Sequence, residues 1–190
     1  MSQEFDLPIY SGRQLWHYCT YSMSCSGLEE RVDSSPMRKF PGYEKGILAA
    51  INTLRDDVDR HHLWVFGSLC WDAYVEGSDS ERWKYAAQTV EFLQLRLSFQ
   101  DKPDKWKERA HNLARFAVWE VRHRNPPDMS ESRPALFTTI ILSKAAGVAD
   151  PGNFRRDAGE PWDYLCNELE SWVGKALEPL AKWIESKEAA

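Results

Sequence analysis

Hydrophobic side chains recur at intervals of three and four residues through most of this chain, and that interval marks one face of an α-helix. The C-terminal segment has the clearest such stripe, formed by Trp162, Leu165, Leu169, Trp172, Ala176, Leu180 and Trp183. We expect a helix there that begins at Pro161, because proline suits a first helical turn. Pro179 cannot donate a backbone hydrogen bond, so it is expected to kink or divide this helix near Glu178.

Two other segments carry a single hydrophobic stripe each. One stripe consists of Ile47, Ile51, Leu54 and Val58, and the other of Trp106, Ala110, Leu113, Ala117 and Val121. Both predict helices that bury one face. Residues 63–75 are hydrophobic nearly all round. The helix expected after the capping pair Ser78 and Glu81 is hydrophobic on two faces, one of which comprises Trp83, Ala87, Val90, Gln94 and Leu97. We expect these last two segments to form the centre of the core.

The remaining long segment, residues 132–145, is expected to be a helix that buries Leu136, Phe137, Ile140 and Ile141. A strand is the alternative, because β-branched side chains cluster there. No segment of the chain alternates convincingly with a period of two.

The expected fold is therefore all-α: an irregular helical bundle of six or seven helices that forms a single domain over residues 1–190. Serine, glycine and proline predict a long loop at about 22–42. Prolines and glycines also predict breaks at 125–128 and 147–161.

Composition narrows the class of protein. Hydrophobic residues make up 43% of the chain, which fits a globular protein. The net charge of −5 argues against a protein that coats nucleic acid without sequence preference. No hydrophobic run is long enough to span a membrane, and no signal peptide is expected. The four cysteines, which lack a disulfide or zinc spacing, are Cys19, Cys25, Cys70 and Cys166. We expect reduced thiols and a cytoplasmic location. No nucleotide-binding or hydrolase motif is present, and no cofactor is expected.

One short motif suggests catalysis. Arg55 and the adjacent Asp56 precede the pair His61 and His62. This run resembles the Arg-x4–6-His signature of the HEPN superfamily of helical RNA-binding proteins and ribonucleases. The resemblance implies a metal-independent, dimeric ribonuclease in which a histidine transfers protons and Arg55 holds the phosphate. The same residues also suit a charged helix end, with both histidines beneath the C-terminal dipole.

A second pattern suggests a metal site. Glu120 and His123 have the i, i+3 spacing of the Glu-x-x-His ligands in ferritin-like di-iron bundles. Asp59 and His62 repeat that spacing with an aspartate in place of the glutamate, and Glu91 lies between the two pairs. A structural ion pair of Glu120 with an arginine is the competing interpretation, and it is the one we adopt.

Basic residues concentrate between positions 102 and 124, where the net charge is +4 against −9 for the rest of the chain. The basic residues are Lys102, Lys105, Lys107, Arg109, Arg115, Arg122 and Arg124. The interleaved Trp106 and Trp119 are typical of nucleic-acid grooves, which combine stacking with phosphate contacts. These cations are spread round the helix axis, however, and an ordinary solvated helix is the alternative.

The nine tryptophans indicate either a large core or an interface, because both are enriched in this side chain. Trp119 lies off the stripe of its own helix, and Trp183 and Ile184 follow the expected kink, so these three are candidate partner anchors. We therefore expect a non-catalytic intracellular protein that acts by macromolecular contact. A protein partner is preferred because the chain is acidic, and nucleic acid is the alternative. Such a protein would be an accessory or regulatory subunit, or an inhibitor that docks on a larger, nucleic-acid-processing assembly.

Overall fold

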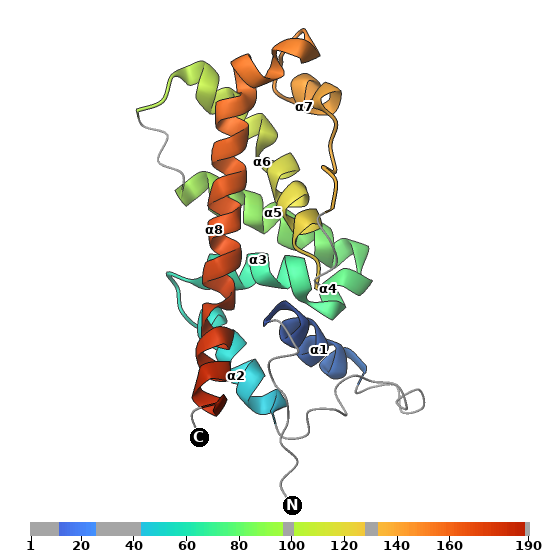
Figure 1. The fold of residues 1–190 in the computed structure, drawn as a ribbon, viewed down its shortest axis with the longest axis vertical. Helices are drawn as coiled ribbons and strands as arrows, with labels where there is room; N and C mark the ends of the chain where they lie inside the picture. Colours follow the sequence, from blue (N-terminus) through green and yellow to red (C-terminus); the bar gives the residue numbers. More distant parts are fainter. Residues whose placement is uncertain (1–11, 26–42, 97–100, 128–132, 189–190) are drawn as a thin grey trace, which may run out of the picture.

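Helices account for 83% of the described residues in this computed structural model, and no strand occurs among them (Figure 1). The structure describes residues 12–25, 43–96, 101–127 and 133–188. Its helices are α1 (Gly12–Cys25), α2 (Glu44–Arg55), α3 (His61–Trp71), α4 (Ala73–Gly77), α5 (Asp79–Arg96), α6 (Asp104–Arg124), α7 (Thr139–Ala145), the 3-10 turn η4 (Pro151–Asn153) and α8 (Phe154–Glu188). The all-α prediction is confirmed. Within the described ranges there are eight α-helices rather than the six or seven expected.

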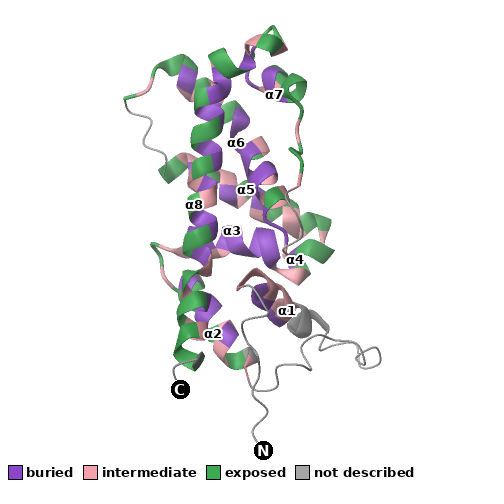
Figure 2. Cartoon of the chain, viewed as in Figure 1, coloured by how far each residue is buried: buried purple, intermediate pink, exposed green. Residues whose placement is uncertain are grey.

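Helix α8 forms the long axis of the molecule (Figure 1). It packs against α6 and α3 along one part of its length and against α2 toward its C-terminal end. The predicted stripe is buried from Trp162 to Leu180, and Figure 2 shows buried residues along the inner side of the helix. The predicted start is wrong, because η4 leads directly into α8 and leaves Pro161 inside the helix. Pro179 lies inside the helix and does not divide it, and the stripe residues on either side of it, Ala176 and Leu180, are both buried.

Helix α6 also follows its predicted stripe, because all five stripe residues are buried: Trp106, Ala110, Leu113, Ala117 and Val121. The helix ends where a break was expected. The side chain of Asn125 donates to the carbonyl of Val121 at 2.8 Å, and the carbonyl of Asn125 accepts from the indole of Trp71 at 2.9 Å. These bonds fix the end of α6 against α3.

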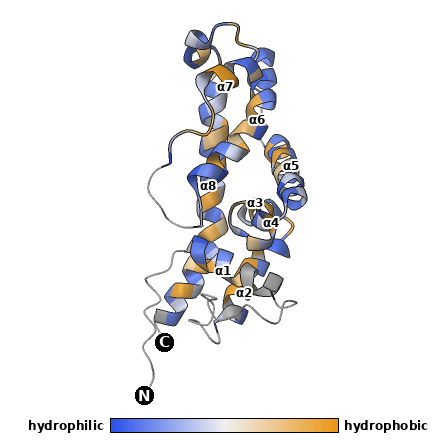
Figure 3. Cartoon of the chain, turned by 90° about the vertical axis from the view of Figure 1, so that its right-hand side faces the viewer, coloured by the Kyte–Doolittle hydropathy of each residue, from blue (hydrophilic) through white to orange (hydrophobic). Residues whose placement is uncertain are grey.

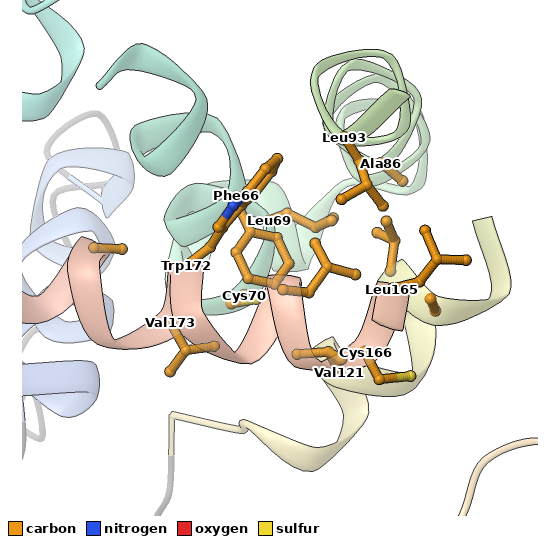
Figure 4. Packing of buried hydrophobic residues seen from close by; sticks show 14 of the residues in the cluster. Phe66, Leu69, Cys70, Ala86, Leu93, Val121, Leu165, Cys166, Trp172 and Val173 are labelled. Carbon is orange, nitrogen blue, oxygen red and sulfur yellow. The ribbon is translucent and has the colours of Figure 1, made fainter. Parts of the chain in front are cut away.

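Helix α3 is the centre of the core, as its hydrophobic composition predicts. Figure 4 shows its side chains between those of α8 and α5, and the rings of Phe66 and Trp172 lie 6.0 Å apart, edge to face. The predicted segment 63–75 is interrupted at Asp72, whose carboxylate accepts the backbone N–H groups of Tyr74 and Val75. That cap starts α4 in a new direction, which adds one helix to the expected number.

Helix α5 is less enclosed than its sequence suggests. The predicted buried face is wrong: Trp83 is 65% exposed, whereas Ala86, Thr89 and Leu93 are buried. Those small and medium side chains let α5 pack closely on α3 and α6, so the bulkier side is turned outward. Figure 3 shows α5 at the edge of the molecule.

The helix predicted over residues 132–145 is shorter than expected. Helix α7 begins only at Thr139, and the side chains of Leu136, Ile140 and Ile141 are exposed instead of buried. The alternative strand is not formed by the described residues either. The physical reason is that the backbone N–H groups of Leu136 and Phe137 bind a carboxylate from α6 rather than carbonyls of their own chain segment.

Two helices at the opposite end complete the described fold. Helix α1 lies so close to α3 that a Cβ atom added to Gly67 would lie 2.5 Å from the ring of Trp16. Helix α2 ends at Arg55, which leaves Val58, the last residue of its predicted stripe, 91% exposed beyond the helix. The predicted loop at 22–42 begins inside α1, and its residues 26–42 lie outside the described part of the chain.

Candidate functional site

A buried carboxylate on α6 organises the surface between α6 and residues 133–138. Glu120 is 1% exposed. Its Oε1 accepts from Nε and Nη2 of Arg124, one turn further along α6, at 2.9 and 2.8 Å. Its Oε2 accepts the backbone N–H groups of Leu136 and Phe137 at 3.0 and 3.4 Å. Glu120 therefore ties an extended segment to the side of α6.

This segment, α5 and α6 together enclose an aromatic groove of about 580 Å³. The aromatic groove is lined by Asp79, Arg82, Trp83, Arg115, Phe116, Trp119, Leu136 and Phe137. Its rings meet edge to face in two pairs. Trp83 and Trp119 have centroids 5.3 Å apart, and Phe116 and Phe137 have centroids 5.1 Å apart. Such pairs fix the shape of the groove without closing it.

Much apolar area of the aromatic groove is open to solvent. Trp83 is 65% exposed and Leu136 is 43% exposed, while Phe116, Trp119 and Phe137 are half-buried. These side chains come from two helices and a segment that are separated in sequence. A contiguous exposed apolar surface of this kind marks binding sites more often than scattered single residues do.

Cations surround the aromatic groove. The guanidinium of Arg115 lies over the ring of Phe116 at 5.0 Å, and that of Arg122 lies over Trp119 at 5.5 Å. Arg82 pairs with Asp79 of the same helix. Burial lowers the pKa of Arg122, and its Nε donates to the carbonyl of Leu69 at 2.8 Å.

The remaining cations predicted between residues 102 and 124 serve other contacts. Lys102 pairs with Glu160 at 2.6 Å, Lys107 lies 3.6 Å from Asp104, and Arg109 donates to the carbonyl of Asp157. Arg124 holds Glu120, as described above, and Lys105 is exposed. The contacts of these six cations thus point to several neighbours around the helix, rather than to one strip.

Of the predicted anchors, Trp119 lies in the aromatic groove and Trp183 does not. Trp183 is half-buried on α2, where its ring lies edge to face with Tyr43 at 5.7 Å. A Cβ atom added to Gly46 would lie 2.5 Å from the indole nitrogen of Trp183. Ile184 is half-buried as well and packs against the same core. These positions favour the packing interpretation for Trp183 and Ile184.

The side chains of the Arg-x4–6-His motif make separate contacts in the structure. The guanidinium of Arg55 pairs with Asp56 at 2.9 Å. Nδ1 of His61 lies 2.9 Å from the backbone carbonyl oxygen of Arg55, and the His61 ring stacks on Trp64 with centroids 5.4 Å apart. His62 is 6% exposed and packs edge to face on Trp172 at 4.7 Å. Burial lowers the pKa of His62 to about 4, so this ring is neutral at physiological pH. The ribonuclease hypothesis then depends on His61, and its activity test stays a prediction.

The candidate metal ligands take separate roles. Glu120 forms the ion pair that the competing interpretation required, with Arg124 as its partner. His62 is in the core and Glu91 is exposed. Within the described part of the chain, no three His, Cys, Asp or Glu side chains are grouped so that they could hold a metal ion.

A second, more polar cavity of about 330 Å³ lies between α1, α3, α4 and the end of α6. Its lining includes His17, Cys70, Arg122 and His123. Nδ1 of His17 is 3.2 Å from the carbonyl oxygen of Trp71. Burial raises the pKa of the Cys70 thiol to about 12, so it is not a thiolate near neutral pH and lacks the reactivity of a catalytic cysteine.

No protein family, curated protein or solved structure matches this chain. The helices in the described ranges also include none with the length and hydropathy needed to cross a membrane. Sequence reasoning identified Trp119 but missed its partners Trp83, Phe116, Leu136 and Phe137. Periodicity assigned Trp83, Leu136 and Phe137 to the core, and the groove is only apparent once α5, α6 and the segment at 133–138 are seen together.

Proposed function

We propose that this protein is non-catalytic and acts by binding another protein through the aromatic groove. The observation that carries this proposal is the exposure of Trp83 beside Trp119, in a groove whose third wall is held in place by Glu120. Tryptophan and arginine are the side chains that contribute most often to binding hot spots. The groove presents both types at its centre and rim, on rigid helices that need little reorganisation to bind.

A protein partner is favoured over nucleic acid because arginines of the same chain already cover aromatic rings of the groove. Bases stack on open aromatic faces. Arg115 and Arg122 of the same chain already cover one face of Phe116 and one face of Trp119. The partly apolar groove that remains suits an inserted side chain better than a stacked base. The net charge of −5 also disfavours a nucleic-acid partner.

In this proposal the protein is an accessory or regulatory subunit, or an inhibitor, of a larger assembly in the cytoplasm. Three buried cysteines of the described part of the chain, Cys19, Cys70 and Cys166, are free thiols. Free thiols are typical of reducing compartments and support that location.

Site-specific photocrosslinking in cells of the source organism tests the proposal. Benzoylphenylalanine replaces Leu136, whose exposed side chain lines the aromatic groove, or Val58 as a matched exposed control outside it. We expect one discrete crosslinked protein from position 136, its loss when Trp83→Ala is added, and no such product from position 58. Equal products from both positions, or none from position 136, would contradict the proposal.

A further inference from the structure

We infer that the segment received by the aromatic groove is an acidic one, with a large apolar side chain next to one or more carboxylates. This inference rests on the proposed function and names the chemistry of the partner. The partner's apolar side chain would insert beside Trp83 and Trp119, and its carboxylate would meet Arg115 at the rim.

The first reason is the balance of charge around the groove. Its charged lining consists of Arg82 and Arg115 against Asp79 alone, and Arg122 lies over Trp119 beside it. This local excess of positive charge occurs in a chain whose net charge is −5. Complementary charge steers partners and excludes those of the same sign, so an acidic segment is favoured.

The second reason is that the guanidinium of Arg115 can bind a carboxylate of the partner. Arg82 is paired with Asp79, and Arg122 donates to the carbonyl of Leu69. Arg115 is exposed and touches the ring of Phe116, but it forms no ion pair with any carboxylate of the described residues. A guanidinium held over a ring keeps its planar donors free for a bidentate carboxylate.

The volume of the groove and its positive charge further restrict what kind of partner could bind there. A volume of about 580 Å³ is within the range of ~300–1,000 Å³ in which proteins bury small ligands, and it suits a few side chains rather than a whole helix bundle. A second copy of this chain is disfavoured, because a symmetric contact through the groove would place the same excess of positive charge on both sides of the interface. The expected occupant is therefore a short segment of a different protein.

Selection from a phage-displayed library of random peptides tests the inference with the full-length protein. Wild-type protein is the target and the Trp83→Ala variant is the counter-target, so that only groove-dependent peptides are retained. We expect the enriched peptides to combine Trp, Phe or Leu with adjacent Asp or Glu. Synthetic copies labelled with fluorescein are then titrated by fluorescence anisotropy.

A charge reversal at the rim makes the test quantitative. Arg115→Glu is expected to weaken binding of the acidic peptide about tenfold or more, and to strengthen binding of a copy in which lysine replaces each acidic residue. Lys105→Glu is the matched control. It changes the net charge equally at an exposed position of α6 outside the groove, so it should change affinity less than about twofold.

Four results would overturn the inference. Enrichment of basic or uncharged peptides would refute the acidic segment, and so would the absence of peptides whose binding depends on Trp83. The proposed function would still stand if position 136 crosslinks to a protein in cells. Binding of oligothymidylate that is lost in Trp83→Ala would assign the groove to nucleic acid and overturn both. A dimer in sedimentation equilibrium that Trp83→Ala dissociates would assign the groove to a second copy.

Discussion

The carboxylate of Glu120 accepts the backbone N–H of Leu136 at 3.0 Å, and this contact joins two segments that sequence patterns treat separately. Glu120 directly follows Trp119, and Leu136 forms the facing wall of the aromatic groove. The depth of the groove is therefore set by a residue that does not line it. Changes at Glu120 are expected to affect both the stability of the fold and partner binding.

Removal of this carboxylate should be costly. Glu120→Ala leaves two backbone N–H groups without their acceptor and frees Arg124, so we expect a loss of about 2–4 kcal/mol in the free energy of unfolding. Glu120→Gln keeps an acceptor oxygen and should lose about 1–2 kcal/mol. Urea denaturation measures both. The exposed Glu91→Gln on α5 is the control, expected within about 0.5 kcal/mol of wild type. A wild-type stability for Glu120→Ala would show that residues 133–138 are held by other contacts.

Binding and stability should separate at the tryptophans. Trp83 is 65% exposed, so Trp83→Ala should cost less than about 1 kcal/mol of stability while it weakens partner binding by about thirtyfold. Trp172 is 1% exposed, and Trp172→Ala should lose about 3–5 kcal/mol. Melting curves and titration with a crosslinked or selected partner distinguish the two. If Trp83→Ala lowers the melting temperature as much as Trp172→Ala does, the ring is a core residue rather than a binding residue.

Two glycines should respond to alanine in opposite directions. Gly174 lies in the middle of α8 with nothing within 4 Å of an added Cβ atom, so Gly174→Ala should stabilise the protein by about 0.5–1 kcal/mol through helix propensity. In Gly46→Ala the same gain is opposed by the ring of Trp183, which lies 2.5 Å from the added atom. We expect a net loss of stability there by thermal denaturation. A gain at both positions would mean that Trp183 moves freely from α2.

Acidification should destabilise the fold through His62. Burial lowers its pKa from 6.5 to about 4, and the nearby Arg96 acts in the same direction. Between pH 4 and pH 6.5, His62 is mostly protonated in the unfolded chain and mostly neutral in the folded chain. The contribution to stability is therefore complete above pH 6.5 and declines as the pH falls toward 4. We expect a loss of about 2 kcal/mol between pH 7 and pH 5.

Comparison of His62→Phe with wild type isolates this effect, because Phe is neutral at every pH and suits the aromatic surroundings of Phe92 and Trp172. Urea unfolding at pH 7 and pH 5 should show a smaller pH dependence for the variant. His111→Gln, at an exposed position of α6, should retain the wild-type dependence. If the stability of His62→Phe depends on pH as strongly as that of wild type, a group other than His62 takes up the proton.

The helices that pack along one face were predictable from sequence. In α6 and α8 the hydrophobic stripe has the full period of a helix and little competing apolar surface, so the buried side is unambiguous. Both stripes are buried, from Trp106 to Val121 and from Trp162 to Leu180. The last predicted member of the α8 stripe, Trp183, is half-buried on α2.

The aromatic groove was not predictable, because its residues break the same rule. Periodicity assumes that a large apolar side chain is buried, and it therefore placed Trp83 and Leu136 inside. The structure instead buries the smaller Ala86 and Thr89 of α5. The backbone N–H groups of Leu136 and Phe137 donate to Glu120. The contact with Glu120, which is distant in sequence, is what prevents a helix at 134–138. A local sequence pattern cannot predict such a contact.

Helix α8 has 35 residues, which corresponds to a rod about 50 Å long, and it packs on α6 near one end and on α2 near the other. Neither end of the molecule can then lose its order without exposing part of this rod. Backbone amides in the middle of α8, around Leu169 and Trp172, should exchange with deuterium only through global unfolding. Protection from exchange at the two ends of α8 is expected to change together, so a partner bound beside α6 should also slow exchange in α2.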